Sequence, residues 1–416
     1  MNYVFWHHDV HGPFTLESVW TATHGFAGSV ARLRILFWLA GRGHGVQLIG
    51  NVASGEYRGV RATAGENWSD IRLDEHTVAV MLTPPTGEMW ERVPSAIRRR
   101  MIFWANNPFD PVWIARARAK ELLRVVCIAP WHRELYRIYK GFDEVELGFH
   151  GIDLDMIAAA RPRADAAGAV LFCSVPKRAK GVHRLLAAWR VVQRTMPGAR
   201  LRIAGSPRMH EPDLRVGVTG ILEPEVEAEF PDFFGEWPAS AERAGITLLG
   251  TRSIPEVASE MKSAALVVVN CNWNGGLELS CSAAVQAQAA GTPVVAPARG
   301  GLPDLIVDGR TGLLVKKQDP AAIGDAIVTL LKDASLRKRL GDAGPGFVRP
   351  FADYDIVAAE WDAIVERARR GEPAPRQRRF VGDLLRAVGY GRVRSFARNG
   401  IRGTAFERAM LKRVAT

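Results

Sequence analysis

The chain has 416 residues, of which 47% are hydrophobic and 24% are charged. These proportions are near the average for soluble globular proteins and exclude a chain that is mostly disordered or fibrous. The length suffices for two or three domains that bury a core without disulfide or metal support, and 55 Lys and Arg against 44 Asp and Glu give a net charge of +11.

In the first part of the chain, short apolar runs rich in Val and Ile alternate with longer stretches of helical period. This alternation is typical of parallel sheets covered by helices. An amphipathic helix is predicted over Ser29 to Gly41. Strands are predicted at Tyr3 to His7, Val46 to Gly50, Thr77 to Leu82, Met101 to Trp104, Arg124 to Ala129 and Glu144 to Phe149.

A second series of the same kind follows a linker. Ala158 to Gly168 is small and polar and contains Pro162, so we expect the domain boundary near residue 165. A helix is predicted from about Gly181 to Arg194. Strands are predicted at Ala169 to Val175, Ala199 to Ala204, Ile246 to Leu249, Ala265 to Asn270, Pro293 to Ala296 and Gly312 to Val315. We therefore expect an α/β protein with two Rossmann-like, doubly wound parallel-sheet domains, residues 1–165 and 166–355, facing each other across a cleft.

Ser206 to Ala244 interrupts the second series and is too long for an ordinary loop of this architecture. The spacing of its acidic residues lacks the glycine and ligand pattern of an EF-hand. We therefore expect an acidic insertion whose charges face solvent. The carboxylates are those of Glu223, Glu225, Glu227, Glu229, Asp232 and Glu236.

The segment Asn272 to Pro297 is the most informative part of the sequence. A strand ending near Cys271 leads into a turn at Gly275-Gly276, and a helix of small residues follows from about Ser280 to Ala290. The free N–H groups and the dipole at the start of such a helix attract phosphate. Glu278 is awkward beside a phosphate unless it faces hydroxyl groups, which a sugar supplies. The alternative is an ordinary acidic residue near a helix N-terminus.

Gly300 to Val315 supplies further context. Gly300 and Gly301 precede a short helix, and Asp308-Gly309 forms a tight turn into the last predicted strand. Together the two segments resemble the C-terminal half of glycosyltransferase family 4, which has the GT-B fold. Members carry a Glu, seven residues and a second Glu, then GxPVVA, GG-P-E/D and DG-TG-LV. The resemblance is strong over roughly residues 165 to 370 and weak before them.

In that family the first Glu contacts hydroxyls of the donor sugar and the second contacts the ribose. The resemblance therefore implies that Glu278 is a catalytic residue and that Gln286 contacts the ribose. Because Gln lacks the charge of Glu, its bond to a hydroxyl is weaker. Cys281 and Ser282 replace the family's usual Gly-Leu, although small side chains still let the backbone approach phosphate. The other donor-binding residues that we expect are Gly250, Gly276, Leu279, Ser280, Cys281 and Ser282.

A pyrophosphate leaving group needs compensating positive charge, either from a metal ion or from basic side chains. Pro176 to Gly181 is similar to the family's R-x4-K-G element, which neutralises the phosphates without metal. Lys180 matches the family lysine and is the second expected catalytic residue, whereas Val175 stands at the arginine position. Lys177 or Arg178 is expected to substitute for that arginine. The alternative is that these are the charges of a solvent-exposed turn.

The first domain resembles the family less. Gly28 to His44 is similar to the family's first helix, and Gly28 is expected beneath donor and acceptor. Asn106 stands where many relatives place a histidine and is the other expected acceptor-side residue. The resemblance also implies that a helix at 356–372 crosses back to the first domain.

No metal site is expected. Asp153-Leu154-Asp155 matches the D-x-D of metal-dependent transferases of another fold, but it lies in a segment that resembles the family's GVDL element, which favours a structural role. His7, His8 and His132 lack partners at ligand spacing.

Residues 373–416 form a strongly basic tail with eleven Arg and Lys opposed only by Asp383 and Glu407. Such a tail prefers an anionic surface, with a merely solvated tail as the alternative. Aromatic stacking platforms for nucleic acid are missing. Met1 to Val10 has no basic start, and no apolar run approaches the roughly 20 residues that span a bilayer. We therefore expect a cytoplasmic protein, peripheral at the inner face of the membrane.

The sequence as a whole predicts a hexosyltransferase that needs no cofactor and takes a nucleoside diphosphate sugar as donor. The acceptor is expected to be a saccharide or a lipid-linked saccharide. Retention of anomeric configuration without a metal follows from the family resemblance. The rival interpretations are a GT-B epimerase or phosphorylase and a catalytically silent binding protein on a membrane surface, which Val175 and Gln286 leave open.

Overall fold

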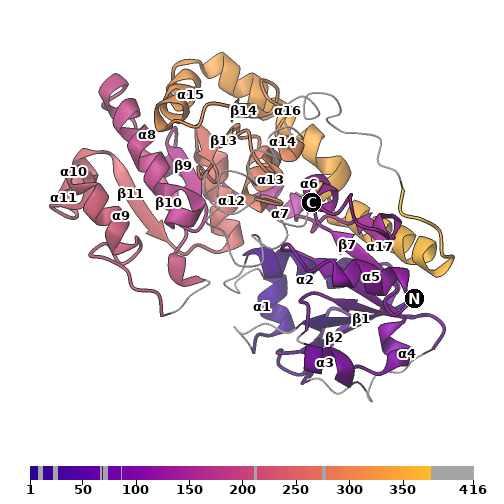
Figure 1. Ribbon diagram of the computed structural model, residues 1–416. Coiled ribbons are helices and arrows are strands. Elements are labelled where there is room, and N and C mark those ends of the chain that lie inside the picture. Colours follow the sequence, from indigo (N-terminus) through magenta and orange to yellow (C-terminus); the bar gives the residue numbers. More distant parts are fainter. Residues whose placement is uncertain are drawn as a thin grey trace. The chain divides into compact units, whose positions relative to one another are not determined.

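The computed structural model describes residues 1–7, 13–21, 27–65, 68, 74–85, 87–209, 213–273 and 278–375. These residues form two α/β units, each built on its own sheet (Figure 1). The first unit comprises most of residues 1–151 together with the described residues after 350, and the second comprises residues 152–350.

The first unit contains an eight-stranded sheet with the order β3-β4-β2-β1-β5-β6-β7-β8. All neighbouring strands are parallel except the β3–β4 pair. All six strands predicted from the apolar runs are present, whereas β3 and β4 were not predicted. The strands are β1 (Asn2–His7), β2 (Gly45–Gly50), β3 (Gly55–Tyr57), β4 (Val60–Ala64), β5 (Thr77–Met81), β6 (Met101–Ala105), β7 (Arg124–Cys127) and β8 (Val145–Leu147).

The helices of the first unit include one from the C-terminal part of the chain, α17 (Tyr354–Arg369). Trp361 on α17 is fully buried and meets Trp104 of β6 edge to face, with ring centroids 4.7 Å apart. The carboxylate of Glu146 on β8 pairs with Arg367 of the same helix. The remaining helices are α1 (Leu16–Trp20), α2 (Ala27–Gly41), α3 (Gly87–Arg92), α4 (Ser95–Arg98), α5 (Val112–Arg118), α6 (Pro130–Glu134) and the 3-10 turn η2 (Phe142–Glu144).

The second unit contains a six-stranded, fully parallel sheet with the order β11-β10-β9-β12-β13-β14. This is the strand order of a Rossmann fold, in which the chain winds outward from β9 in both directions. The six strands predicted in this half of the sequence are all present. They are β9 (Val170–Cys173), β10 (Leu201–Ala204), β11 (Ile246–Gly250), β12 (Leu266–Val268), β13 (Val294–Pro297) and β14 (Gly312–Val315).

Helices cover both faces of this sheet. On one face α8 (Val182–Thr195) packs against α15 (Pro320–Lys332), and on the other α12 (Ile254–Ser263) packs against α13 (Ser282–Ala289) and α7 (Leu154–Ala159). The remaining helices are α9 (Pro224–Glu229), α10 (Pro231–Phe234), α11 (Ala239–Arg243), α14 (Leu302–Leu305), α16 (Ala334–Ala352) and the 3-10 turns η3 (Ala164–Ala166), η4 (Arg178–Lys180) and η5 (Pro207–Met209).

Both predicted doubly wound folds are therefore confirmed, and the strand order of the second unit points to one place for a ligand. The winding direction reverses between β9 and β12, and ligands of open parallel sheets bind at the carboxyl ends of the strands at such a switch point. The loops that leave β9 and β12 at this edge contain the basic and acidic residues predicted to be catalytic.

Candidate active site

Two loops of the second unit bring Lys180 and Glu278 together although they are 98 residues apart in sequence. Lys180 ends the turn η4 between β9 and α8, and Glu278 precedes α13 in the segment after β12. The Nζ atom of Lys180 lies 2.9 Å from Oε2 of Glu278. The Glu278 side chain is 14% exposed and the Lys180 side chain 38%, so the pair is partly accessible to solvent rather than buried in the core.

Gly181 permits this close approach of the two loops. It has a left-handed backbone with φ of 81° and is the N-cap of α8. A Cβ atom at this position would lie 2.3 Å from the backbone nitrogen of Asn272, so a side chain there would push the two loops apart. The requirement for glycine after Lys180 is therefore both conformational and steric.

A pair of neighbouring glycines, Gly300 and Gly301, fixes the backbone at Glu278. The amide of Gly301 donates to the carbonyl oxygen of Glu278 at 2.7 Å. Gly300 has a left-handed φ of 58°, and a Cβ on Gly301 would lie 2.2 Å from the carbonyl oxygen of Leu279. The Gly300-Gly301 motif thus supports the loop that carries the carboxylate.

Gly301→Ala is therefore expected to destabilise the folded protein, although the φ of −80° at Gly301 suits alanine. The added methyl group forces the 278–279 backbone to move and costs about 1–3 kcal/mol of unfolding free energy. Urea unfolding would measure the loss. Gly198→Ala is the matched control because a Cβ there meets nothing within 4 Å. Equal stability of the two variants would contradict the proposed support.

The charges of the pair stabilise each other. Burial alone lowers the pKa of Lys180, but the charge and hydrogen bond of Glu278 outweigh it and raise that pKa above its ordinary value. Burial, followed by the negative charge of Glu278, raises the pKa of the nearby Cys281 to about 12. At neutral pH Lys180 is therefore an ammonium group and Cys281 a neutral thiol.

The carboxylate is held through one of its two oxygens. Oε2 of Glu278 accepts from Lys180 and also from Nδ2 of Asn270, a residue 4% exposed at the end of the β12 segment. No described residue donates a hydrogen bond to Oε1. This oxygen can accept from a hydroxyl group.

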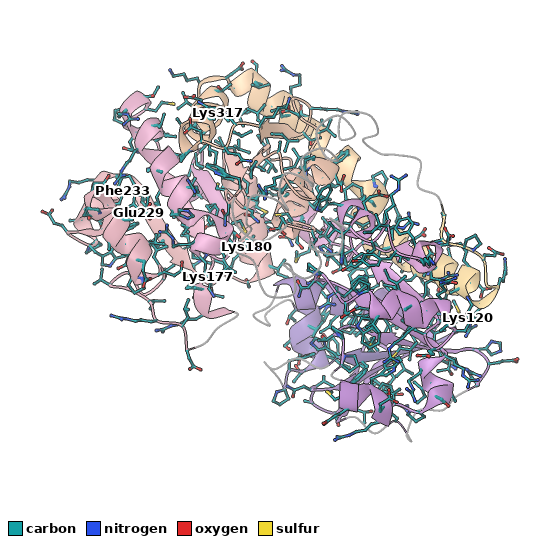
Figure 2. The ribbon with its side chains drawn as sticks, viewed as in Figure 1. Lys120, Lys177, Lys180, Glu229, Phe233 and Lys317 are labelled. Atoms are coloured by element: carbon teal, nitrogen blue, oxygen red, sulfur yellow. The ribbon has the colours of Figure 1, made fainter. Side chains whose placement is uncertain are left out.

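Arg178 contacts two carboxylates of the acidic insertion. Its guanidinium pairs with Glu229 of α9, and its amide donates to Glu223 at 2.7 Å. Figure 2 shows Lys177 and Lys180 near one another and Glu229 on the adjoining α9–α11 segment. Lys177 is half-buried in the same loop. Phosphate contacts by Lys177 and Arg178 remain predictions.

The prediction that the insertion exposes its acidic residues to solvent is wrong for Glu227. This side chain is buried and accepts from the amides of Val218 and Thr219 and from the Thr219 hydroxyl, at 2.8, 3.0 and 2.6 Å. The physical reason is that apolar side chains alternate with the carboxylates and join the core of the second unit. They are those of Leu222, Val226, Phe230, Phe233 and Phe234.

Most of the other predicted donor-binding residues lie in the segment that leads into α13 or on α13 itself. Gly276 lies outside the described residues. Leu279 and Cys281 are buried, and Cys281 is the N-cap of α13, whose first residue is Ser282. Within the described part of the chain, the buried hydroxyl of Ser280 has no hydrogen-bond partner. Gln286 is half-buried on α13, and Gly250 ends β11, where its carbonyl accepts from Gly205 at 2.9 Å.

The predicted acceptor-side residues belong to the first unit. Gly28 lies in the first turn of α2, and Asn106 directly follows β6. Asp153 caps α7 by accepting from the Met156 amide at 2.8 Å, which agrees with its predicted structural role. In the part of the chain that the structure describes, His, Cys, Asp and Glu side chains form no group of three that could hold a metal ion.

Sequence reasoning missed two asparagines in the site. Asn270 binds Glu278, and Nδ2 of Asn272 donates to the carbonyls of Ala179 at 2.9 Å and Arg178 at 3.2 Å. The available signal was two polar residues directly after an apolar strand, at the edge of the sheet where parallel strands place ligand contacts.

The two sheets can be compared with those of solved structures. A solved structure of the Anabaena protein HepE in complex with UDP and glucose is similar to this chain, with a TM-score of 0.62 and 13% identity over 88% of this chain and 99% of that protein. The chain thus has the GT-B fold of glycosyltransferases.

Sequence relatives agree with the fold. Residues 160–347 match the family described as glycosyl transferases group 1. A glycogen synthase of Mycobacterium tuberculosis is 26% identical over 61% of this chain and 56% of its own length. A D-inositol 3-phosphate glycosyltransferase of Paenarthrobacter aurescens is 33% identical over 46% of this chain and 47% of its own. The matches thus span about half the length of these relatives.

Proposed function

We propose that the chain transfers a sugar from a nucleoside diphosphate sugar to a saccharide or lipid-linked saccharide acceptor. The observation that supports this most is the pair at the switch point of the second sheet. Lys180 offers an ammonium group to a diphosphate, and Glu278 offers a carboxylate oxygen to sugar hydroxyls. The diphosphate and the sugar of such a donor thus each find a partner of suitable chemistry.

The geometry also suits the chemistry of the reaction. When the bond between the sugar and the diphosphate breaks, negative charge grows on the leaving phosphate, and a nearby ammonium group stabilises that charge. The N–H groups at the start of α13 add to this stabilisation. We propose that the leaving phosphate assists deprotonation of the acceptor hydroxyl, so that configuration is retained and no metal is needed.

The test is a panel of nucleotide sugars with mono- and disaccharide acceptors, beginning with UDP-glucose because HepE was solved with UDP and glucose. We expect thermal stabilisation by the true donor, since a ligand that binds only the folded state raises the melting temperature. We also expect transfer, or slow hydrolysis without acceptor, and NMR of the product would show the anomeric configuration. Isomerisation without acceptor would indicate an epimerase, dependence on inorganic phosphate a phosphorylase, and binding without turnover a silent protein.

Attachment to an anionic membrane through residues 373–416 remains part of the proposal, and residues 376–416 lie outside the described part of the chain. No helix in the described residues is both long and apolar enough to cross a bilayer. We expect co-sedimentation with anionic vesicles at low salt that is lost when residues 376–416 are deleted, because each Lys or Arg near such a surface contributes about 1 kcal/mol. Equal binding to neutral vesicles would contradict an electrostatic attachment.

A further inference from the structure

The side chain of Asn270 lies in a hydrogen-bonded circuit that joins both loops of the candidate site. Its Nδ2 donates to Oε2 of Glu278, and its Oδ1 accepts from the amide of Asn272 at 3.3 Å. Asn272 in turn donates to the carbonyl oxygens of Arg178 and Ala179, and the next residue, Lys180, closes the circuit on Glu278.

The partners determine which way the Asn270 amide faces. A carboxylate can only accept, so the NH2 group must point to Glu278, and a backbone N–H can only donate, so the carbonyl oxygen must point to Asn272. The backbone of Asn270 has φ of 33°, in the left-handed region that asparagine adopts more readily than most residues. Residue 270 therefore has to combine this conformation with a donor and an acceptor, which favours asparagine.

We infer that Asn270 is a positioning residue for the transfer reaction: it holds Oε2 of Glu278 beside Lys180 so that Oε1 is presented to the donor sugar. This inference rests on the proposed function. Lys180 alone does not fix the carboxylate, because an ammonium group on a flexible stem can follow it through several positions. The buried amide of Asn270, 4% exposed, supplies the second, rigid contact.

Asn270→Asp tests the inference. Aspartate keeps the size, the tolerance of a left-handed backbone and an acceptor for Asn272, but it replaces the donor to Glu278 by a second carboxylate. We expect kcat/KM to fall about 10- to 100-fold, as for loss of a hydrogen bond to a charged group. We also expect the acidic limb of the pH profile to move up by about one unit, because two neighbouring carboxylates hold a proton at higher pH. The shift reports the contact between residue 270 and Glu278, because a carboxylate that did not face Glu278 would leave that limb in place.

The control for the added charge is Gln318→Glu, an exposed position on the same unit. Should the aspartate variant fail to fold, Asn270→Gly keeps the backbone conformation and should lower kcat with no shift of the acidic limb. If the wild type is active and the folded variant is equally active, Asn270 is not a positioning residue. That outcome does not contradict the proposed function. A wild type that turns over no sugar nucleotide would overturn both.

Discussion

Replacing Glu278 by Gln is expected to lower kcat/KM for sugar transfer by about 10²- to 10³-fold, in the range found when one preorganised contact to a transition state is removed. Glutamine keeps the length and one acceptor, but it lacks the charge that holds Lys180 at 2.9 Å. The anomeric carbon gains positive charge in the transition state, and the neutral amide of glutamine stabilises that charge less than the carboxylate of Glu278 does. Initial rates at subsaturating donor would measure the change.

The two parts of a sugar nucleotide separate this role from a general loss of binding. Because Glu278 is proposed to face the sugar, Glu278→Gln should leave the affinity for the free nucleoside diphosphate unchanged or slightly higher in calorimetry. Glu242→Gln on α11 is the control, since Glu242 is exposed and outside the site. Normal turnover by the Glu278 variant would refute the assignment.

Much of the fold follows from the sequence because parallel strands buried on both faces read as continuous apolar runs. The runs at Val46 and Ala265 each become a strand within a few residues of the predicted bounds. The β3–β4 hairpin was missed because its strands have only three and five residues, and Gly55 and Arg61 interrupt any apolar run. Its formation depends on pairing with β2, which no local pattern contains.

The candidate site was predictable to the extent that it depends on strand ends. Lys180 and Glu278 each follow a strand, and the Rossmann order places those two strands next to each other. Their direct contact was not predicted, because it depends on the close approach that Gly181 allows. Asn270 was missed for the same reason, since its partners lie on a loop whose course the sequence pattern does not define.

The ion pair of Arg178 could not be predicted from the neighbouring sequence. Its position near Lys180 made it a natural substitute for the missing family arginine, yet its guanidinium pairs with Glu229, 51 residues away. Glu229 belongs to the acidic insertion. Apolar residues of this insertion pack in the core of the second unit, and Asp232 pairs with Arg190 at 2.5 Å. The insertion therefore adds negative charge beside the turn η4, and Lys180 becomes the main candidate for neutralising a diphosphate.

Lys180→Ala is accordingly expected to weaken nucleoside diphosphate binding by about 10- to 100-fold, since a charge-assisted hydrogen bond to phosphate is lost. The variant also leaves Glu278 without its cation, so the carboxylate repels the incoming diphosphate. The pKa of Lys180 is raised, so its ammonium form persists beyond the pH at which an ordinary lysine loses its proton. Lys180 should therefore cause no loss of wild-type affinity between pH 7 and 10.

Lys332→Ala, exposed in the last turn of α15, is the control. Calorimetry with UDP measures the effect, and an unchanged dissociation constant would show that the diphosphate is held elsewhere.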